Sequence, residues 1–369
     1  MPVRLFDTDV QKLKYEVLRE VARHAYDGRL ADSYVDIPKR LAPGPKPTMR
    51  CCVYKERAIL TERVRLAMGG DRGDPNVVEV IGIACDECPV SGYQVGRDCR
   101  GCIAHRCMAA CPKAAISLDA NRRACIDPKK CVGCGKCAAA CPYSAIANHR
   151  RPCENACKVK AIRMGEDNCA SIEAGKCIGC GACAYQCPFG AIQDKSYLLE
   201  AIDIVRGSER GKQYKAYAIV APSISSQFGS GKLGQMVTAL KRLGFFSVVE
   251  AALGADMVAW QEARELAQKG FLTTSCCPAF VDYVQKGFPE LAPHISHNLS
   301  PMAELARYLK KTDPTAKAVF IGPCTAKKQE RKRPDVAPFV DCVLTFEELQ
   351  AWIDSRDIDL TTLPEDVLD

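Results

Sequence analysis

The placement of cysteine constrains this chain more than any other feature of its sequence. Twenty of the 24 cysteines lie between Cys51 and Cys187, and the next 88 residues contain none. The last four are Cys276, Cys277, Cys324 and Cys342. A first part must therefore fold around its cysteines, and a second part must build a core largely without them. With 369 residues, of which 47% are hydrophobic, the chain can form two or three domains.

The amino terminus and the hydropathy favour a chain that stays inside the cell. The first twenty residues contain no apolar signal region and no twin arginine, and no stretch approaches 18 uninterrupted apolar residues. We therefore expect a cytoplasmic protein without a membrane span. Because a reducing cytosol disfavours disulfides, the cysteines are expected to bind metal. The net charge of +7 comes from dispersed Lys and Arg, so we expect no nucleic-acid partner.

Residues 1–80 are predicted to be helical. Leu13, Val17, Leu18 and Val21 recur at helical spacing and form one apolar face. A Pro/Gly-rich linker at 41–50 precedes a second helical run, and packing is the role expected for this segment.

Residues 81–195 contain an internal repeat. Its copies are CRGCIAHRCMAACPKAAI (99–116), CVGCGKCAAACPYSAI (131–146), CIGCGACAYQCPFGAI (177–192) and a degenerate RPCENACKVKAI (151–162). The end of each copy, small residues followed by Ile, predicts a short helix and then a strand.

The repeat spacing is typical of two-cluster bacterial ferredoxins. Three thiolates in one tight loop can reach three irons of a cube, and the fourth cysteine, followed by Pro, reaches the neighbouring cube. Zinc usually takes two separated pairs, so a third cysteine three residues on argues against it. Two 4Fe-4S clusters follow, with Cys99, Cys102, Cys107 and Cys141 at one and Cys111, Cys131, Cys134 and Cys137 at the other.

The remaining copies predict a third cluster and suggest a fourth. Cys157, Cys177, Cys180 and Cys183 would hold the third, and Cys85, Cys88, Cys153 and Cys187 are candidate ligands of the fourth. Clusters spaced in this way form a path for electrons. Five cysteines have no predicted role: Cys51, Cys52, Cys125, Cys169 and Cys342. For each of the first four, a buried thiol is as good an explanation as ligation.

From Tyr214 onward the sequence reads as α/β. The runs AYAIVAPS (216–223) and AVFIGPC (318–324) are apolar strands that run into loops, and FLTTSCCPAFVDYVQK (271–286) reads as a strand, a loop and a helix, so residues 271–274 are expected in the strand. In open α/β sheets ligands bind beyond the carboxyl ends of strands, which is where Pro222, the Cys276–Cys277 pair and Cys324 fall.

Two motifs in this second part carry a resemblance. TSCCPAF (274–280) and GPCTAKKQE (322–330) resemble the first two active-site motifs of the iron-only ([FeFe]) hydrogenases, and APS (221–223) and SHNLSPM (296–302) also look like family segments. The likeness covers roughly residues 81–350. It implies α+β ferredoxin-like iron–sulfur modules followed by an α/β domain like that of the hydrogenase large subunit. The expected parts are 1–80, 81–195 and 213–369.

The resemblance implies roles for individual residues. Cys277 and Cys324 would be two thiolate ligands of the H-cluster, a four-iron cube joined to a di-iron unit with CO, cyanide and a bridging dithiolate. Lys327 would donate hydrogen bonds to a cyanide ligand. Ala221 and Pro222 would line the di-iron pocket.

The resemblance also implies a proton path. Cys276 would not be a ligand but the thiol that passes protons to the bridgehead amine. Glu262 and Glu265, three residues apart on one helical face, would continue the path together with Ser296.

The chain departs from the family pattern at several positions. Phe280 replaces Trp, Gly322 replaces Met and Met302 stands where Gln is frequent, and the first two changes resemble a monomeric, ferredoxin-rich branch of the family. The third family motif, ExMxCxxGCxxGG, has no counterpart, and the sequence ends in one more helix that Thr345 and Glu348 would cap. We therefore expect a fragment of a longer protein, inactive by itself.

The favoured function is reversible 2H⁺ + 2e⁻ ⇌ H₂, fed by 4Fe-4S clusters. The expected partners are a soluble electron carrier such as ferredoxin, H₂ and protons, and hydrogenase maturation proteins. A non-catalytic sensory or iron–sulfur assembly protein on the same scaffold is the alternative, and an electron-transfer subunit would leave the two cysteine motifs without purpose. Three cubes of about −2 each would bring the +7 chain close to neutral.

Overall fold

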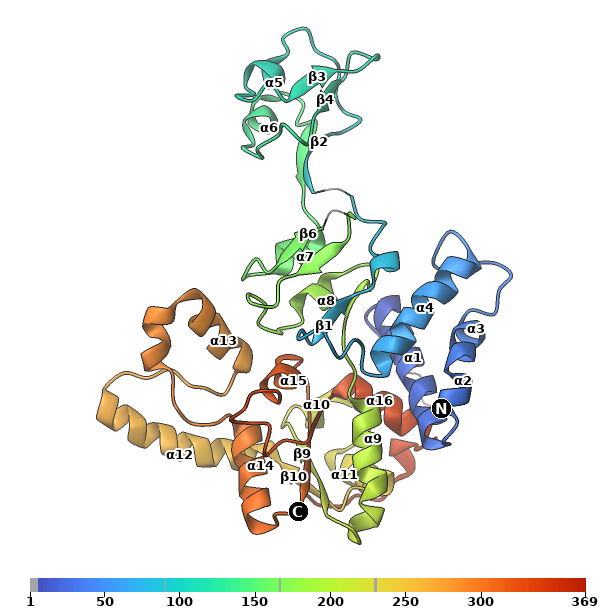
Figure 1. The fold of residues 1–369 in the computed structure, drawn as a ribbon, viewed down its shortest axis with the longest axis vertical. Coiled ribbons are helices and arrows are strands. Elements are labelled where there is room, and N and C mark those ends of the chain that lie inside the picture. The colour runs from blue at the N-terminus through green and yellow to red at the C-terminus, as the bar shows by residue number, and fades with distance from the viewer. Residues whose placement is uncertain (1–5, 90, 166, 229–230) are drawn as a thin grey trace.

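The computed structural model describes residues 6–89, 91–165, 167–228 and 231–369 (Figure 1). The first five residues of the predicted helical segment lie outside that description. The segment forms α1 (Asp9–Tyr26), α2 (Leu30–Ser33), the 3-10 helix η1 (Tyr34–Asp36), α3 (Ile37–Leu41) and α4 (Val53–Ala67). Helix α1 begins where the Thr8 side chain accepts a hydrogen bond from the Gln11 backbone N–H. Its predicted face is buried at Val17, Leu18 and Val21, against α4 and α16.

Two ferredoxin-like modules with the same element order follow. We call residues 92–149 the inserted module and residues 78–89 with 151–194 the parent module. The inserted module contains β2 (Gly92–Val95), α5 (Arg106–Ala109), β3 (Ile116–Leu118), β4 (Ala124–Ile126), α6 (Lys136–Ala140) and β5 (Ile146–His149). The parent module contains β1 (Val78–Val80), the 3-10 helix η2 (Gly82–Ala84), α7 (Pro152–Ala156), β6 (Ile162–Met164), β7 (Ala170–Ile172), α8 (Ala182–Gln186) and β8 (Ile192–Asp194). The expected short helix followed by a strand is present in all four repeat copies.

The inserted module lies within a single loop of the parent module. Its outer strands β2 and β5 pair antiparallel, with Gly92 opposite His149, so the chain leaves and re-enters at one place. In the parent module the outer strands β1 and β8 pair in the same way. Figure 1 shows the inserted module at the top of the molecule, joined to the parent module through the β2–β5 ribbon.

The carboxyl-terminal α/β part is built on a four-stranded parallel sheet. The strands, in the order β10-β9-β11-β12, are β9 (Ala216–Val220), β10 (Ser247–Glu250), β11 (Lys317–Gly322) and β12 (Cys342–Thr345). The longer helices are α9 (Leu198–Gly207), α11 (Leu233–Leu243), α12 (Ala251–Lys269), α13 (Pro278–Gly287), α14 (Pro301–Thr312) and α16 (Phe346–Ser355). The short helices are α10 (Ile224–Gln227), α15 (Ala326–Glu330) and the 3-10 helices η3 (Glu209–Gly211), η4 (Pro289–His294) and η5 (Leu360–Thr362).

One sequence prediction in this part is wrong. Residues 271–274 form no strand, and their only ladder contact is an isolated bridge between Thr273 and Ile295. Apolar residues alone do not form a strand when no neighbouring strand is available to pair with them. The predicted strands at β9 and β11 and the Thr345–Glu348 capping box of α16 are confirmed.

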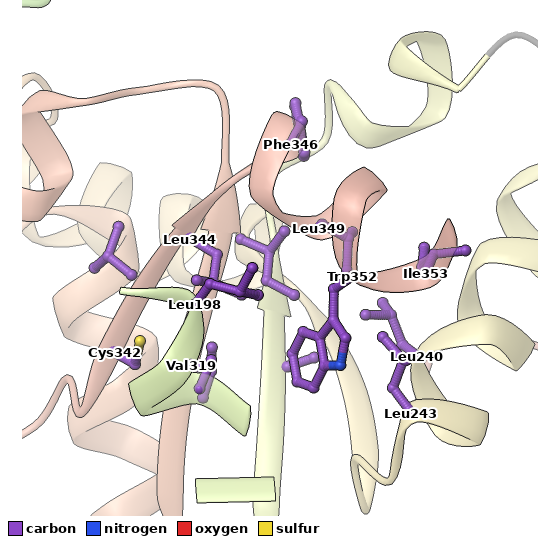
Figure 2. Packing of buried hydrophobic residues seen from close by; sticks show 14 of the residues in the cluster. Leu198, Leu240, Leu243, Val319, Cys342, Leu344, Phe346, Leu349, Trp352 and Ile353 are labelled. Carbon is purple, nitrogen blue, oxygen red and sulfur yellow. The ribbon is translucent and has the colours of Figure 1, made fainter. Parts of the chain in front are cut away.

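The largest hydrophobic core joins the sheet to helices from both ends of the sequence. Trp352 of α16 is fully buried, and its ring meets Phe245 edge-on at 5.8 Å between centroids. Figure 2 shows Trp352 beside Leu240 and Leu243 of α11. The amino-terminal helices share this core, so they are part of the α/β body. Within the described ranges, no helix is long and apolar enough to cross a membrane.

Candidate metal sites and active site

In the inserted module, three thiols of one predicted group and all four of the other lie near one another. Cys107 lies within electrostatic range of Cys102 and Cys141, and Cys137 within range of Cys131 and Cys111. Burial raises the pKa of both Cys107 and Cys137, and the neighbouring thiols add to that effect. A small cavity is lined by Cys111, Cys131, Cys134 and Cys137. This donor set, four thiols from two loops, suits a 4Fe-4S cluster.

The thiols of the parent module gather in two further groups. Burial raises the pKa of Cys183 to about 12, and Cys177, Cys180 and Cys157 are its charged neighbours. Burial likewise raises the pKa of Cys153 to about 11, and the nearby Cys187 and Cys85 thiols add to it. Buried thiols with such pKa values stay protonated until a metal replaces the proton. The four sets therefore fit the ligand assignments expected from the repeat spacing.

A recurring amide contact shows that the degenerate repeat copy is geometrically equivalent to the others. The N–H of Ala115 donates to Cys111 Sγ at 3.3 Å, that of Ala161 to Cys157 Sγ at 3.2 Å and that of Ala191 to Cys187 Sγ at 3.2 Å. In each case the donor lies four residues after the cysteine. Copy 151–162 keeps this geometry although Lys158 replaces the usual Pro.

No three His, Cys, Asp or Glu side chains in the described part of the chain converge tightly enough to hold a single metal ion. A four-iron cube separates its thiolates more widely than one ion does. The four thiol sets meet the wider requirement in number and chemical type.

The parent module abuts the second cysteine motif of the α/β part. A methyl group at Gly179 would lie 3.3 Å from Gln329 Cβ, and one at Gly181 would lie 2.6 Å from Thr325 Oγ1. Both glycines belong to the Cys177–Cys183 loop, and Thr325 directly follows Cys324. Lys286 of α13 also donates to the Cys177 carbonyl oxygen at 2.5 Å. The predicted third cluster site and the Cys324 loop are therefore neighbours, with Gly181 close to the Thr325 side chain.

Two of the resemblance-derived active-site residues, Ala221 and Cys324, follow adjacent strands at the carboxyl end of the sheet. Ala221 follows β9 and Cys324 follows β11, and these strands are neighbours in the parallel sheet. The Ala221 N–H donates to the Ile321 carbonyl oxygen at 2.9 Å, which fixes the two loops relative to each other. Cys277 is the N-cap residue of α13 and is exposed, as are Pro222 and Cys276.

Lys327 is held with its ammonium group beside the first cysteine motif. It is 8% exposed, and its Nζ donates to the Cys276 carbonyl oxygen at 3.1 Å and to Glu330 Oε2 at 2.8 Å. Glu330 is itself buried, so the pair is shielded from water. Glu330 ends the GPCTAKKQE motif and was not predicted as a site residue; its i,i+3 spacing from Lys327 is the sequence signal for this pair.

The residues of the predicted proton path lie in two separate hydrogen-bonded halves. Glu262 accepts from Thr274 Oγ1 at 3.0 Å and from the Ser275 N–H at 3.2 Å, beside Cys276. Ser296 Oγ donates to Glu265 at 3.0 Å. No direct hydrogen bond between Glu262 and Ser296 is found in the described structure, so one further link would have to join them.

The electrostatics of Glu265 favour its charged form. Burial would raise the pKa of Glu265, but hydrogen bonds from Lys269 and Ser296 outweigh it and hold the pKa below the ordinary value. A polar cavity beside this half is lined by Ser275, Ser296, Asn298 and, on the other side, Glu330. The cavity places the Ser296–Glu265 half near the Lys327–Glu330 pair.

The two thiols of this site fit part of an H-cluster. Cys277 and Cys324 would supply two of the cube's ligands, and Lys327 would face the di-iron unit. Cys342 does not join them: it is fully buried on β12, where its Sγ contacts the Tyr197 carbonyl oxygen at 3.5 Å and burial raises its pKa. Cys51 and Cys125 are exposed, Cys52 caps α4, and Cys169 contacts Gly82.

Comparison with protein families places three models on this chain. The iron only hydrogenase large subunit, C-terminal domain, matches residues 214–369. A 4Fe-4S dicluster domain matches residues 98–145, and a 4Fe-4S binding domain matches residues 170–193. Cys85, Cys88 and Cys153 lie outside all three.

Several curated proteins are similar in sequence. The periplasmic [Fe] hydrogenase large subunit of Nitratidesulfovibrio vulgaris is 33% identical over 270 residues, which is 65% of this chain and 59% of that protein. Iron hydrogenase 1 of Clostridium pasteurianum is 30% identical over 194 residues, 46% of this chain and 34% of that protein. The cytosolic Fe-S cluster assembly factor NAR1 of Kluyveromyces lactis is 41% identical over 91 residues, 25% of this chain and 19% of that protein. The chain thus spans three fifths or less of the length of these relatives.

Solved structures of [FeFe]-hydrogenases also match. A variant of HydA1 from Chlamydomonas reinhardtii shares 28% identity, with 46% of this chain and 50% of that chain covered and a TM-score of 0.43.

Proposed function

Because this chain belongs to the iron-only hydrogenase family, we propose that it carries the electron path and part of the active site of an enzyme that interconverts protons and H₂. The observation that carries the proposal is the junction between Gly181 and Thr325, which places a predicted 4Fe-4S site directly against the Cys324 loop. An electron-transfer path needs such a contact, because tunnelling falls steeply with distance. The proposed parts remain residues 1–80, 81–195 and 213–369.

The chain's own residues divide the work of the proposed site. Cys277 and Cys324 would hold the H-cluster, which when bound supplies the metal centre at which protons and electrons combine. Lys327 orients a fixed positive charge toward the first motif, and Glu330 holds that ammonium group in place. Burial of the pair keeps bulk water from competing for it.

Proton movement is proposed to follow the two hydrogen-bonded halves. Glu262 would exchange protons with the Cys276 thiol, and Ser296 would relay protons to and from Glu265, with one further group joining the two halves. The lowered pKa of Glu265 leaves this carboxyl group ionised and free to accept a proton at neutral pH. Lys269, bonded to Glu265 at 2.7 Å, lies at the exposed end of α12. We propose a cytoplasmic location, a ferredoxin-type electron carrier as redox partner, and dependence on hydrogenase maturation proteins.

The test is H₂ uptake and evolution by the anaerobically matured full-length protein. Glu262→Gln and Cys276→Ala should each lower activity at least about a hundredfold while the CO and cyanide infrared bands remain. Asp256→Asn, on the exposed side of the same helix, is the matched control and should keep full activity. Absence of both activity and infrared bands in the wild-type protein would rule out the proposal.

The second candidate function is iron–sulfur cluster assembly, favoured by the similarity to the NAR1 assembly factors. It needs the cluster ligands but gives no purpose to the Ser296–Glu265 contact. Transfer of clusters from the reconstituted protein to an apo-ferredoxin, in the absence of H₂ activity, would favour it. Retention of all clusters during that incubation would count against it.

A further inference from the structure

The parent module has enough cysteines for two clusters only if the cysteines before and after the inserted module are counted as one ligand loop. In the other copies a third cysteine precedes the last one by four positions, as in Cys137–Cys141 and Cys183–Cys187. Cys153 has the same spacing to Cys157, and α7 corresponds to α6 and α8. Cys85 and Cys88 supply the other two loop cysteines, and the whole inserted module lies between Cys88 and Cys153.

The four thiols of this interrupted loop converge in the structure. Cys88 lies within electrostatic range of Cys187 and Cys85, and Cys153 within range of the same two thiols. Cys85, Cys153 and Cys187 are buried. The Ala170 and Ala191 N–H groups donate to Cys85 Sγ at 3.4 Å and to Cys187 Sγ at 3.2 Å. These contacts to sulfur are of the kind that a ligated cluster retains.

Two buried guanidinium groups lie against this set of thiols. Arg151 is 1% exposed, and its partners are Cys85 Sγ at 3.5 Å and the carbonyl oxygens of Pro89 and Asn168. Arg63 is 3% exposed and donates to the Phe189 carbonyl oxygen at 3.2 Å, two residues after Cys187.

Neither guanidinium has an anionic partner among the described residues. Arg63 Nε and Nη1 have no hydrogen-bond partner among the described residues. Arg63 donates to one carbonyl oxygen, and Arg151 to two carbonyl oxygens and a thiol, so no described carboxylate pairs with either of them. A buried cation without a counter-charge is strongly destabilising. Four thiolates around a 4Fe-4S cube carry about −2 in total and would provide that counter-charge.

We propose that Cys85, Cys88, Cys153 and Cys187 hold a fourth 4Fe-4S cluster, and that buried Arg63 and Arg151 give it the most positive reduction potential of the four. The cluster takes up one electron from the electron carrier and becomes about −3 with its ligands, and the two cations stabilise that added charge. The site would then store an electron beside the main path. This inference rests on the proposed electron path but not on H₂ chemistry.

The test is an EPR-monitored redox titration of the reconstituted chain, with dithionite as reductant, together with iron and sulfide analysis. In the wild type, at a given potential, the ratio of reduced to oxidised cluster should be at least tenfold higher for one 4Fe-4S signal than for the others. For a one-electron couple this corresponds to a reduction potential that is about 59 mV more positive. Arg151→Met and Arg63→Met should each lower that ratio for the same signal only. Arg151→Lys keeps the charge and should retain most of it, which separates charge from folding effects.

Two sets of controls complete the experiment. Arg163→Met removes an exposed arginine of the parent module that pairs with Glu173, and it should leave all four signals in place. Cys153→Ser should remove the high-potential signal and about four irons, whereas Cys125→Ser and Cys169→Ser should remove none.

Three results would overturn the inference. The first is an unchanged iron content in Cys153→Ser, and the second is a loss of iron in Cys169→Ser in its place. The third is a wild-type titration in which all signals are reduced at the same potential. A titration that is the same in Arg63→Met and Arg151→Met as in the wild type would contradict the inference in the same way. Each readout is independent of H₂ activity, so failure here and failure of the proposed enzyme are distinguishable.

Discussion

The inserted and parent modules share one fold but differ in what surrounds them. Both follow the same order of strands and helices, and both keep an amide N–H on the last cysteine of a repeat copy. In the parent module Cys85, Cys153, Cys183 and Cys187 are buried, whereas Cys137 is the one buried cysteine of the inserted module, all of which the structure describes. Local sequence thus sets the module fold, and the neighbouring parts of the chain set the burial.

Equivalent positions show how the neighbours act. Asp194 on β8 corresponds to Asn148 on β5 in the repeat. Asn148 is exposed, whereas Asp194 is 8% exposed and accepts from Lys14 Nζ at 2.6 Å and from Lys328 Nζ at 2.8 Å. Lys328 is fully buried and also pairs with Glu348. The parent module is therefore fixed into the α/β body by an ion network that the inserted module lacks at this position.

The largest effect should come from deleting the inserted module. Because Gly92 and His149 are partners across the β2–β5 ribbon, a short turn can join Ser91 to Arg150 without stretching the chain. We expect the iron content to fall by about eight while the parent module keeps its own clusters. Iron and sulfide analysis with circular dichroism checks this. Loss of every cluster would show that the two modules do not fold independently.

Asp194→Asn should have the next largest effect. It leaves Lys14 and Lys328 buried with one carboxylate fewer, so we expect the free energy of unfolding to fall by about 3–5 kcal/mol. Asn148→Asp at the equivalent exposed position is the control and should change it by no more than about 0.5 kcal/mol. Denaturant unfolding followed by the fluorescence of buried Trp352 measures both. Equal changes in the free energy of unfolding for the two variants would mean that the ion network around Asp194 does not distinguish the parent module from the inserted module.

The same network predicts a pH dependence. Burial opposes the charge on Asp194, but Lys14 and Lys328 outweigh it and hold the pKa of the carboxyl well below its ordinary value. A lowered folded pKa stabilises the fold above the unfolded value of about 3.9, and this is lost as the pH falls below it. The stability difference between wild type and Asp194→Asn should therefore be constant from about pH 7 to pH 5 and shrink below about pH 4.

The sequence was sufficient for what depends on local spacing. The short helices of the repeat copies and the capping box at Thr345 follow from patterns of a few residues, and the structure agrees with them. The α/β strands at β9 and β11 were also predictable, because apolar runs that end at Pro or Gly are strong signals. Residues 271–274 failed because a strand requires a partner that local sequence does not reveal.

Long-range charge contacts could not be predicted from the sequence. The Lys14–Asp194 and Lys328–Glu348 pairs join residues far apart in the chain, and nothing in their local patterns points to burial. The same holds for Arg63 and Arg151, which read as surface charges in the sequence. Lys327 and Lys328 show the limit clearly: adjacent lysines, of which one faces the cysteine motif and the other the ion network.

A smaller effect tests the junction with the active-site loop. Gly133 and Gly179 are equivalent and both have a positive φ, 67° and 64°, so alanine is strained at either by about 1 kcal/mol. A methyl group at Gly133 meets nothing within 4 Å, but one at Gly179 meets Gln329 and Val77 at 3.3 Å. Gly179→Ala should therefore lose about 1–3 kcal/mol more than Gly133→Ala in the free energy of unfolding. Equal losses of unfolding free energy would mean that Gln329 and Val77 can move away from the added methyl group without cost.

The smallest effect should be electrostatic and confined to the third cluster. Lys286 places one ammonium group at the Cys177 carbonyl oxygen, and the charge helps to counter the burial that raises the pKa of Cys177. Lys286→Met should make the third cluster harder to reduce, lowering its ratio of reduced to oxidised form by less than tenfold, or its reduction potential by less than about 59 mV. The reduction potentials of the clusters in the inserted module should not change. Lys176→Met, next to Cys177 but paired with Glu173 in solvent, is the control and should shift the potential of the third cluster less. A uniform shift of all clusters after Lys286→Met would instead indicate a general effect of net charge, because a specific contact acts only over the short range within which solvent does not screen it.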